Sequence, residues 1–231
     1  MAFPASYLDK STAIMNSINK DLSKEFKTLV KFYLYSPASI PKVPNNIEAF
    51  SEDHLTRLAQ KFSTGRAVKP PAPPSTIPDS MVSIILQYYF DIKSSELEKI
   101  SKEHSLSMGA ENIVGDLLER YIASVIENKG WVWCTGSTVK AGDFIKEISN
   151  DKWIVLQIKN RDNSENSSSS AIRDGTDIKK WFRTFSRRNE TNWDAFPDDN
   201  LKQYLSEESF KKFVIVYLEE LKKIIKQDNG S

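Results

Sequence analysis

The first hundred residues place hydrophobic side chains at helical spacing. Apolar residues recur at steps of three and four from Ile14 to Val30, which predicts one amphipathic helix that ends near Ser36 and Pro37. A second helix is predicted over 51–62. The chain therefore begins with a helical region.

A proline-rich segment follows, from 69 to 78. Its sequence, KPPAPPSTIP, holds five of the ten prolines. Proline has no amide hydrogen, so the segment can form neither a helix nor a central strand. It is either a semi-rigid linker, the interpretation we favour, or a polyproline ligand for a partner.

Three more helices are predicted before residue 130. The helix over 79–92 is apolar on most sides, so we expect it to be buried, in the core or at a subunit interface. A short, mostly charged helix follows near 95–104. The clearest helix covers 108–128, and its continuous apolar stripe ends before Gly130.

Short runs of β-branched and aromatic residues predict the sheet. A strand over 131–135 precedes a hairpin formed by 144–148 and 153–158, with a turn at 149–151. A last strand, 213–218, should extend the sheet before a short helix at 219–226. The fold class is α/β (α+β), with a mixed central sheet flanked by helices and a helical N-terminal region.

Three polar residues interrupt the hairpin: Asp143, Gln157 and Lys159. Gln157 and Lys159 are two apart on a strand, so their side chains share one face. Either this face is solvated at a strand end and Lys159 extends into water, or the three groups form a site. Carboxylate and carbonyl oxygens suit Mg²⁺, and lysine can stabilise a phosphate or position a water.

The register of the hairpin decides whether these groups meet. A simple hairpin centred between Asn150 and Asp151 would place Asp143 opposite Ile158, on the face away from Gln157. A shared site therefore requires a three-residue turn or a β-bulge.

Asp143, followed after thirteen residues by Gln157-Ile158-Lys159, resembles the D-x(n)-(D/E/Q)-x-K signature of the PD-(D/E)xK nucleases. The resemblance implies a restriction-endonuclease-like core in which Asp143 and Gln157 hold Mg²⁺ and Lys159 is the third catalytic group. The chain departs from the pattern at Gly142, where proline is usual, and at Gln157, a neutral ligand where an acid is usual.

The missing acid makes a further carboxylate from the preceding helix more necessary. In the family a glutamate on this helix often completes the metal site, and two positions compete. Glu119 borders the apolar stripe, and Glu111 lies seven residues before Leu118 on the same side. We rank Glu119 first as a catalytic and metal-binding residue and keep Glu111 as the alternate. Either glutamate could instead complement the helix dipole or pair with its neighbours.

The region after Lys159 predicts a DNA-binding surface. It joins a serine-rich polar loop to a predicted basic amphipathic helix over 176–188. From Lys159 to Arg188 there are eight Lys/Arg and four Asp/Glu, a local net charge of +4 in a chain of net charge +1. A flexible loop and a solvated helix are the structural alternatives. The predicted DNA-binding residues are Asn160, Arg161, Asn163, Asn166, Ser168, Ser169, Arg173, Lys179, Lys180, Arg183, Arg187 and Arg188.

The run KNRDNSENSSSSAIRDGTDIKKWFR also resembles the type II restriction endonucleases of the SinI kind. That resemblance implies Mg²⁺-dependent cleavage of double-stranded DNA at a short palindrome of the GGWCC type by a homodimer, with a DNA methyltransferase in the same system. We accordingly divide the chain into a helical region, 1–104, and a nuclease core, 105–231, with its DNA-binding loop and helix at 160–188.

Composition limits the other possibilities. The single cysteine, Cys134, cannot form an internal disulfide, and two histidines leave no histidine-rich metal site. No apolar run is long enough for a membrane span, and the first residues do not resemble a signal peptide, so we expect a cytoplasmic protein. The alternative function is a non-catalytic DNA- or RNA-binding protein on a decayed nuclease fold.

Overall fold

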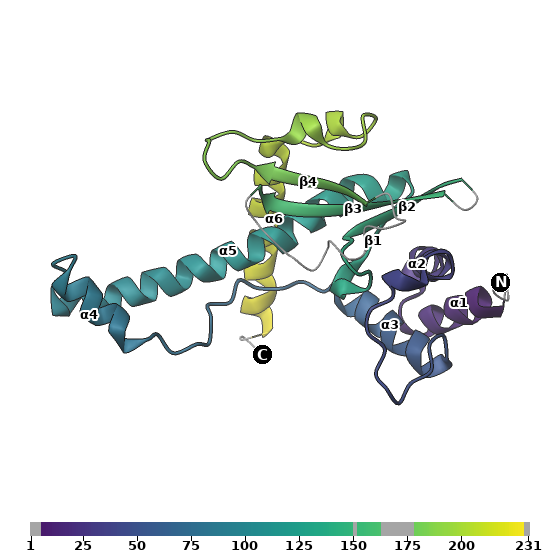
Figure 1. Ribbon diagram of the computed structural model, residues 1–231, viewed down its shortest axis with the longest axis horizontal. Coiled ribbons are helices and arrows are strands. Elements are labelled where there is room, and N and C mark those ends of the chain that lie inside the picture. Colours follow the sequence, from purple (N-terminus) through teal and green to yellow (C-terminus); the bar gives the residue numbers. More distant parts are fainter. Residues whose placement is uncertain (1–5, 150–151, 163–177, 229–231) are drawn as a thin grey trace.

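The computed structural model describes residues 6–149, 152–162 and 178–228 (Figure 1). The helices are α1 (Ser6–Ile18), α2 (Ser23–Tyr35), α3 (Glu52–Thr64), α4 (Ser80–Tyr88), α5 (Leu97–Ile126) and α6 (Glu207–Asp228). The strands are β1 (Trp131–Trp133), β2 (Phe144–Ser149), β3 (Lys152–Arg161) and β4 (Ile178–Thr184).

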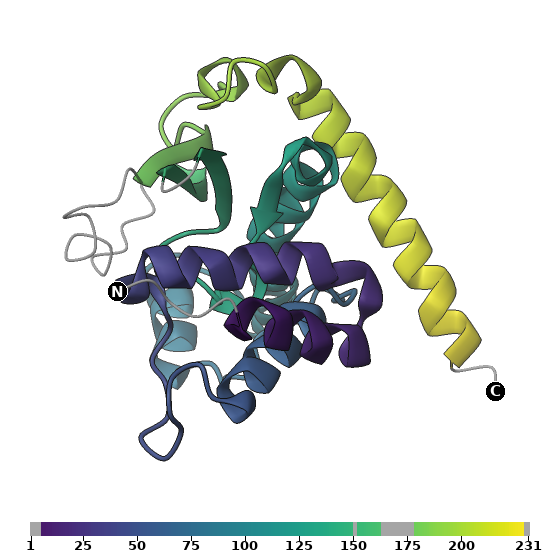
Figure 2. The ribbon, with the colours of Figure 1, turned by 90° about the vertical axis from the view of Figure 1, so that its right-hand side faces the viewer.

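The described strands form one four-stranded mixed sheet in the order β1-β2-β3-β4. The first three strands are antiparallel, and β4 pairs with β3 in parallel. Trp153 and Val155 of β3 pack with the N-terminal helices, whereas Leu156 and Ile158 pack with α5. Helices therefore cover both faces of the sheet (Figure 2), and the predicted fold class is confirmed.

The single helix predicted from Ile14 towards Pro37 is wrong in one respect: the helix is interrupted at Asn19. Asn19 has an extended backbone, and its side-chain oxygen accepts a hydrogen bond from the Asp21 amide at 3.2 Å. Asparagine competes with the helical backbone in this way. The apolar stripe is thus divided between α1 and α2, which pack on each other and, through α1, on α3. The second predicted helix is confirmed as α3, capped by Ser51.

The helices predicted at 95–104 and 108–128 are one continuous helix, α5, of 30 residues. Gly109 lies at the start of the second predicted segment, but a glycine inside a helix costs only about 1 kcal/mol and does not end it. The predicted boundary at 104/105 lies inside this helix. The part of α5 before Gly109 projects from the body together with α4 (Figure 1).

Arg120 joins α5 to the N-terminal helices. Its guanidinium donates hydrogen bonds to three consecutive carbonyl oxygens after α3, those of Gly65, Arg66 and Ala67, at 2.7–3.2 Å. Asp116 accepts a further bond from Arg120 Nε at 2.5 Å. These carbonyls lie just beyond the end of α3, so one side chain fixes the segment that follows α3 against α5.

Two elements near the C-terminus differ from prediction. The predicted helix over 176–188 contains strand β4, because the residues from Ile178 to Thr184 pair with β3. The predicted strand 213–218 lies inside α6, together with the helix predicted at 219–226. Short apolar runs such as FVIVYL do not distinguish a strand from a helix.

Helix α4 is present as predicted, but it is not buried within the chain, and its burial at a subunit interface stays a prediction. None of its residues, all of which the structure describes, is buried. The proline-rich segment before it has no helix or strand, as predicted, and crosses α5 at Gly109. None of the described helices is long and apolar enough to cross a membrane.

The crossing at Gly109 yields a test of this packing. A Cβ at Gly109 would lie 2.9 Å from the backbone nitrogen of Pro73 and 3.0 Å from the Ala72 carbonyl. Gly109→Ala should therefore lower the melting temperature, although alanine is the better helix former. Gly115→Ala is the matched control on the same helix, because its Cβ would meet nothing within 4 Å. It should gain about 1 kcal/mol. Equal stabilisation of both variants in thermal unfolding would show that the proline-rich segment does not pack on α5.

Candidate active site

Asp143 is held immediately before β2 by its backbone. Its amide donates to the Leu156 carbonyl at 2.9 Å, and its carbonyl accepts from the Cys134 amide at 2.8 Å. Its carboxylate oxygen Oδ2 accepts a hydrogen bond from the Ile158 amide at 2.6 Å. The side chain is therefore fixed against β3 beside the Gln157-Ile158-Lys159 segment.

The hairpin contains a β-bulge. Phe144 pairs with Leu156, but the pairing shifts by one residue between Glu147 and Ser149. The pairing ends at Phe144, because the Asp143 amide also bonds at Leu156, and Asp143 reaches the next residues of β3 through its carboxylate, which accepts from the Ile158 amide. The bulge that the predicted site requires is present, and the common face of Asp143 and Gln157 stays a prediction. The tip of the hairpin, 150–151, lies outside the described residues.

Glu119 approaches the same place from α5. Its Oε2 accepts a hydrogen bond from the Trp133 indole Nε1 at 2.9 Å. The guanidinium groups of Arg66 and Arg120 lie over the Trp133 ring, with centroid distances of 5.4 and 5.2 Å. Trp133 is therefore packed in place and orients Glu119. Glu111, the alternate, is exposed on the preceding part of α5.

The two carboxyl groups influence each other electrostatically. Burial raises the pKa of Glu119 to about 8, and the negative charge of Asp143 contributes to this rise. Burial also raises the pKa of Asp143 to about 6, although the Ile158 amide and the Lys159 ammonium both favour its charged form. A cation bound near Asp143 and Glu119 would be stabilised there, because it would favour the ionised forms that burial disfavours.

Lys159 and Lys180 complete this face of the sheet. Lys159 lies two residues beyond Gln157 on β3, and its charge acts on Asp143. Lys180 of β4 is the parallel partner of Gln157. Residues paired in this way point to the same face, so Gln157, Lys159 and Lys180 share one side. Gln157 is buried, with 7% of its surface exposed.

Sequence reasoning missed two features of the site. Trp133 was expected as a strand residue without a polar role, yet its indole N–H orients Glu119. Lys180 was predicted as a DNA-binding residue on a helix, whereas it lies on a strand next to Gln157. The adjacent Trp181 and Phe182 could have indicated that Lys180 lies on a strand, because such a pair fits a β-strand as well as a helix.

The predicted DNA-binding residues are divided by the structure. Asn163, Asn166, Ser168, Ser169 and Arg173 lie outside the described residues. Arg161 is exposed at the end of β3, which also carries Asn160.

Arg183 has a structural partner. Its Nη1 forms an ion pair with both oxygens of Glu207 at 2.7 and 2.9 Å, and its Nε donates to Asn160 Oδ1 at 3.0 Å. The guanidinium also lies over the Phe210 ring. These contacts tie β3 and β4 to α6. Lys179 alternates with Lys180 on β4 and lies on the same face as Arg183.

Arg187 and Arg188 follow β4. With Asp162 and Phe185 they line a cavity of about 430 Å³. Arg188 lies over the Phe185 ring at 3.8 Å and forms an ion pair with Glu190 at 3.3 Å.

Comparison with known proteins identifies the family of this arrangement. A family model described as SinI restriction endonuclease matches residues 6–220. The chain belongs to the SinI restriction endonuclease family. It is 51% identical over 210 residues to the type II restriction enzyme Eco47I of Escherichia coli, covering 88% of this chain and 90% of that one. It is 50% identical over 212 residues to the type II restriction enzyme SinI of Salmonella infantis, covering 90% and 92%.

The SinI-family assignment confirms the predicted resemblance and the predicted activity. The chain is a type II restriction endonuclease, a class of site-specific deoxyribonucleases that act on double-stranded DNA. The alternative of a non-catalytic binding protein is thereby set aside. Among the described residues no cluster of three or more His, Cys, Asp or Glu side chains is arranged to hold a metal. The candidate oxygen ligands are two carboxyl groups and the Gln157 amide.

The raised pKa of Glu119 predicts a pH-dependent stability difference. Between about pH 4.5 and pH 8 the unfolded chain loses a proton that folded Glu119 retains. Rising pH therefore removes stability in this window. Without metal, Glu119→Gln, which keeps an acceptor for Trp133, should match the wild type near pH 4.5 and become increasingly more stable towards pH 8.

Chemical unfolding at a series of pH values measures this difference. Glu111→Gln, which removes an exposed carboxyl from the same helix, should follow the wild type. A Glu119→Gln curve parallel to that of the wild type would contradict the raised pKa.

Proposed function

We propose that this restriction endonuclease uses Mg²⁺, with Asp143 and Gln157 as protein ligands and Glu119 as the additional acid. Mg²⁺ takes oxygen ligands and keeps several waters, so it requires few protein groups. The observation that carries the proposal is the hydrogen bond that fixes the Asp143 carboxylate to the Ile158 amide, between Gln157 and Lys159 on β3. The raised pKa values of Asp143 and Glu119 support a cation between them.

The protein groups have separate roles in this proposal. Bound Mg²⁺ would supply charge stabilisation for the phosphate and a more acidic water. Asp143 is positioned by the Ile158 amide, and Glu119 by the Trp133 indole. Lys159, whose charge acts on Asp143, would contact the scissile phosphate or the attacking water and stabilise the charge that develops there. Glu111 is kept as the alternate to Glu119.

We further propose that the enzyme is a homodimer that cuts a short palindrome of the GGWCC type. One chain offers one such site, and a cut in both strands of a symmetric sequence needs two sites related by a two-fold axis. Asn160, Arg161, Lys179, Lys180, Arg183, Arg187 and Arg188 are proposed to contact DNA, together with Asn163, Asn166, Ser168, Ser169 and Arg173. Arg183 would have to exchange its ion pair with Glu207 to do so. A methyltransferase of the same system would protect the host DNA, and the cytoplasm is the expected location.

Digestion of unmethylated phage DNA tests the catalytic proposal. Mg²⁺ should produce discrete fragments whose mapped ends give the site, and EDTA should abolish them. Lys159→Ala should slow cleavage by about 100-fold or more, because it removes a charge from the reacting centre. Lys152→Ala, at the exposed start of the same strand, is the matched control and should cut at the wild-type rate. Full activity of Lys159→Ala would remove Lys159 from the site.

Gln157 allows a second test, of metal binding alone. Gln157→Glu adds a third acid to a buried site, so its melting temperature without metal should fall below that of the wild type. Mg²⁺ should then raise the melting temperature of this variant more than that of the wild type, because the added charge is a stronger ligand. An equal Mg²⁺ effect on both proteins would place Gln157 outside the ligand set.

A further inference from the structure

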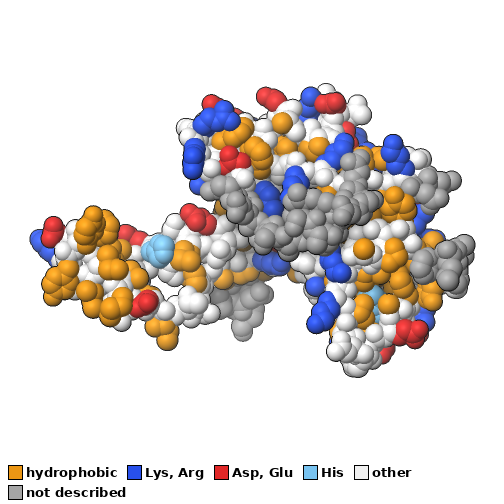
Figure 3. Space-filling view, viewed as in Figure 1, with side chains coloured by type: hydrophobic (Ala, Val, Ile, Leu, Met, Phe, Trp, Pro, Cys, Tyr) orange, Lys and Arg blue, Asp and Glu red, His pale blue; other side chains and the backbone are white. Residues whose placement is uncertain are grey.

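The helical projection formed by residues 77–108, which we call the arm, exposes an apolar surface. It comprises α4 and the first part of α5 (Figure 1). Ile85 has 55% of its surface exposed, Tyr88 83% and Tyr89 77%. Figure 3 shows hydrophobic side chains gathered at the end of the arm. The exposed large apolar residues are Ile77, Met81, Val82, Ile84, Ile85, Tyr88, Tyr89, Phe90, Leu106 and Met108.

The charge distribution distinguishes this surface from an ordinary solvated helix. The segment from Ser80 to Phe90 contains no charged residue. On the first part of α5 the charged side chains pair with one another, as Lys102 does with Glu98 at 2.7 Å. The arm therefore carries a charge-free helix, α4, that offers nothing to a phosphate backbone but suits an equally apolar surface.

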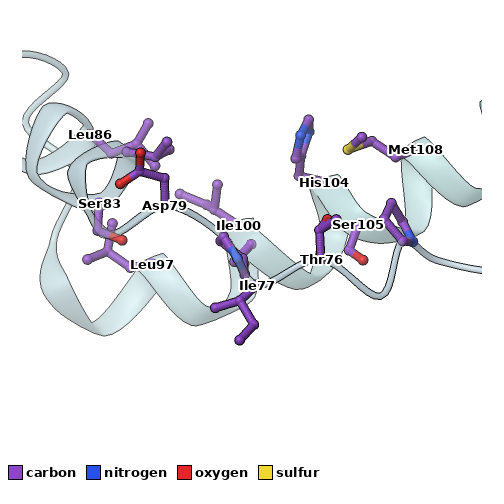
Figure 4. Close-up of a pocket in the computed structure, with 14 residues that line it drawn as sticks. Thr76, Ile77, Asp79, Ser83, Leu86, Leu97, Ile100, His104, Ser105 and Met108 are labelled. Atoms are coloured by element: carbon purple, nitrogen blue, oxygen red, sulfur yellow. The ribbon is translucent and has the colours of Figure 1, made fainter.

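The interior of the arm is incompletely filled. A cavity of about 510 Å³ lies between α4, the end of the proline-rich segment and the first part of α5 (Figure 4). Leu86 and Val82 of α4 line it from one side, and Leu97, Ile100 and Met108 of α5 from the other. The arm thus has neither a solvated polar exterior nor a closed core of its own.

The size of the exposed surface matches an interface. At about 150–200 Å² for a large side chain, the exposed fractions amount to roughly 1,000 Å² on one chain. A stable protein–protein interface buries about 800 Å² on each partner, and the largest apolar patch of a typical monomer is about 300–600 Å². An isolated projection of this kind would be costly to expose in water.

We propose that the arm docks on the same arm of a second copy of this chain. This inference rests on the proposed function, in which two active sites act across a two-fold axis. A two-fold interface uses the same patch on both subunits, so the patch must be complementary to itself. The uncharged apolar surface of α4 meets that requirement, because contact between two copies of it brings no like charges together. Helix α5 then links the interface directly to Glu119.

Helix α6 is the competing surface. Ile215, with 56% of its surface exposed, and Val216, with 52%, also face solvent. On α6 such residues are interspersed with Lys211, Lys212 and Glu219, as in a solvated helix. Ile85 and Ile215 are therefore a matched pair, equal in residue type and exposure but on different surfaces.

Sedimentation of the full chain with Ile85→Lys and with Ile215→Lys tests the proposal. Wild type and Ile215→Lys should be dimers, whereas Ile85→Lys should raise the dimer dissociation constant by about 100-fold, because the lysine enters the interface from both subunits. Tyr88→Lys should act in the same way. Both side chains are exposed in the monomer, so thermal unfolding should show folded variants.

The other outcomes overturn the proposal. A dimer broken by Ile215→Lys but not by Ile85→Lys or Tyr88→Lys places the interface on α6, and a wild type that stays monomeric rejects the interface. Mg²⁺-induced stabilisation of Ile85→Lys, which leaves the site intact, separates the question of the metal site from that of the interface. If Ile85→Lys is monomeric and Mg²⁺ still stabilises it, the metal site is retained and the interface lies on the arm. Dimers of the wild type that cut no DNA would reject the catalytic proposal and leave the arm contact standing.

Discussion

The β-bulge between Glu147 and Ser149 is the constraint on which the candidate site depends. A simple hairpin would pair Asp143 with Ile158. With the bulge, Phe144 pairs with Leu156, the Asp143 amide bonds the Leu156 carbonyl, and the Asp143 carboxylate reaches the Ile158 amide. The strand order then adds Lys180 beside Gln157. The pairing of one hairpin thus decides which part of β3 the Asp143 carboxylate meets.

Helix α5 connects the parts of the molecule around this hairpin. Through Arg120 it holds the segment that follows α3, and through its apolar stripe it covers the sheet. Glu119, one position before Arg120, approaches Asp143 from that helix. Arg120 therefore has a structural role, and its neighbour Glu119 has a chemical one. Trp133, which lies under the Arg120 guanidinium and donates to Glu119, holds the two together.

The local pattern predicted the parts of the fold that depend on local chemistry. Features that combine residue type with spacing could be predicted: the buried strand 153–158, the apolar stripe of 108–128 and the motif from Asp143 to Lys159. The strand at 178–184 could not be predicted, because a partner distant in sequence decides its conformation. The same holds for α6, whose FVIVYL run suits a strand equally well. Asp143 and Glu119 were predicted as site residues, but their electrostatic interaction depends on how α5 lies against the hairpin, which no periodicity encodes. The exposure of α4 was missed for a related reason. An apolar helix predicts burial, but its sequence does not indicate which other element covers it.

The environment of Trp133 has an optical consequence. All five tryptophans are buried, with 2–6% of their surfaces exposed, so water contributes little to the indole emission of the folded chain. Among them, Trp133 donates its N–H to Glu119 and lies against two guanidinium groups. An indole emission spectrum responds to charges fixed near its ring. A proton or cation arriving at Glu119 would therefore shift the fluorescence without any change in solvent exposure, which gives this enzyme an intrinsic spectroscopic reporter of its site.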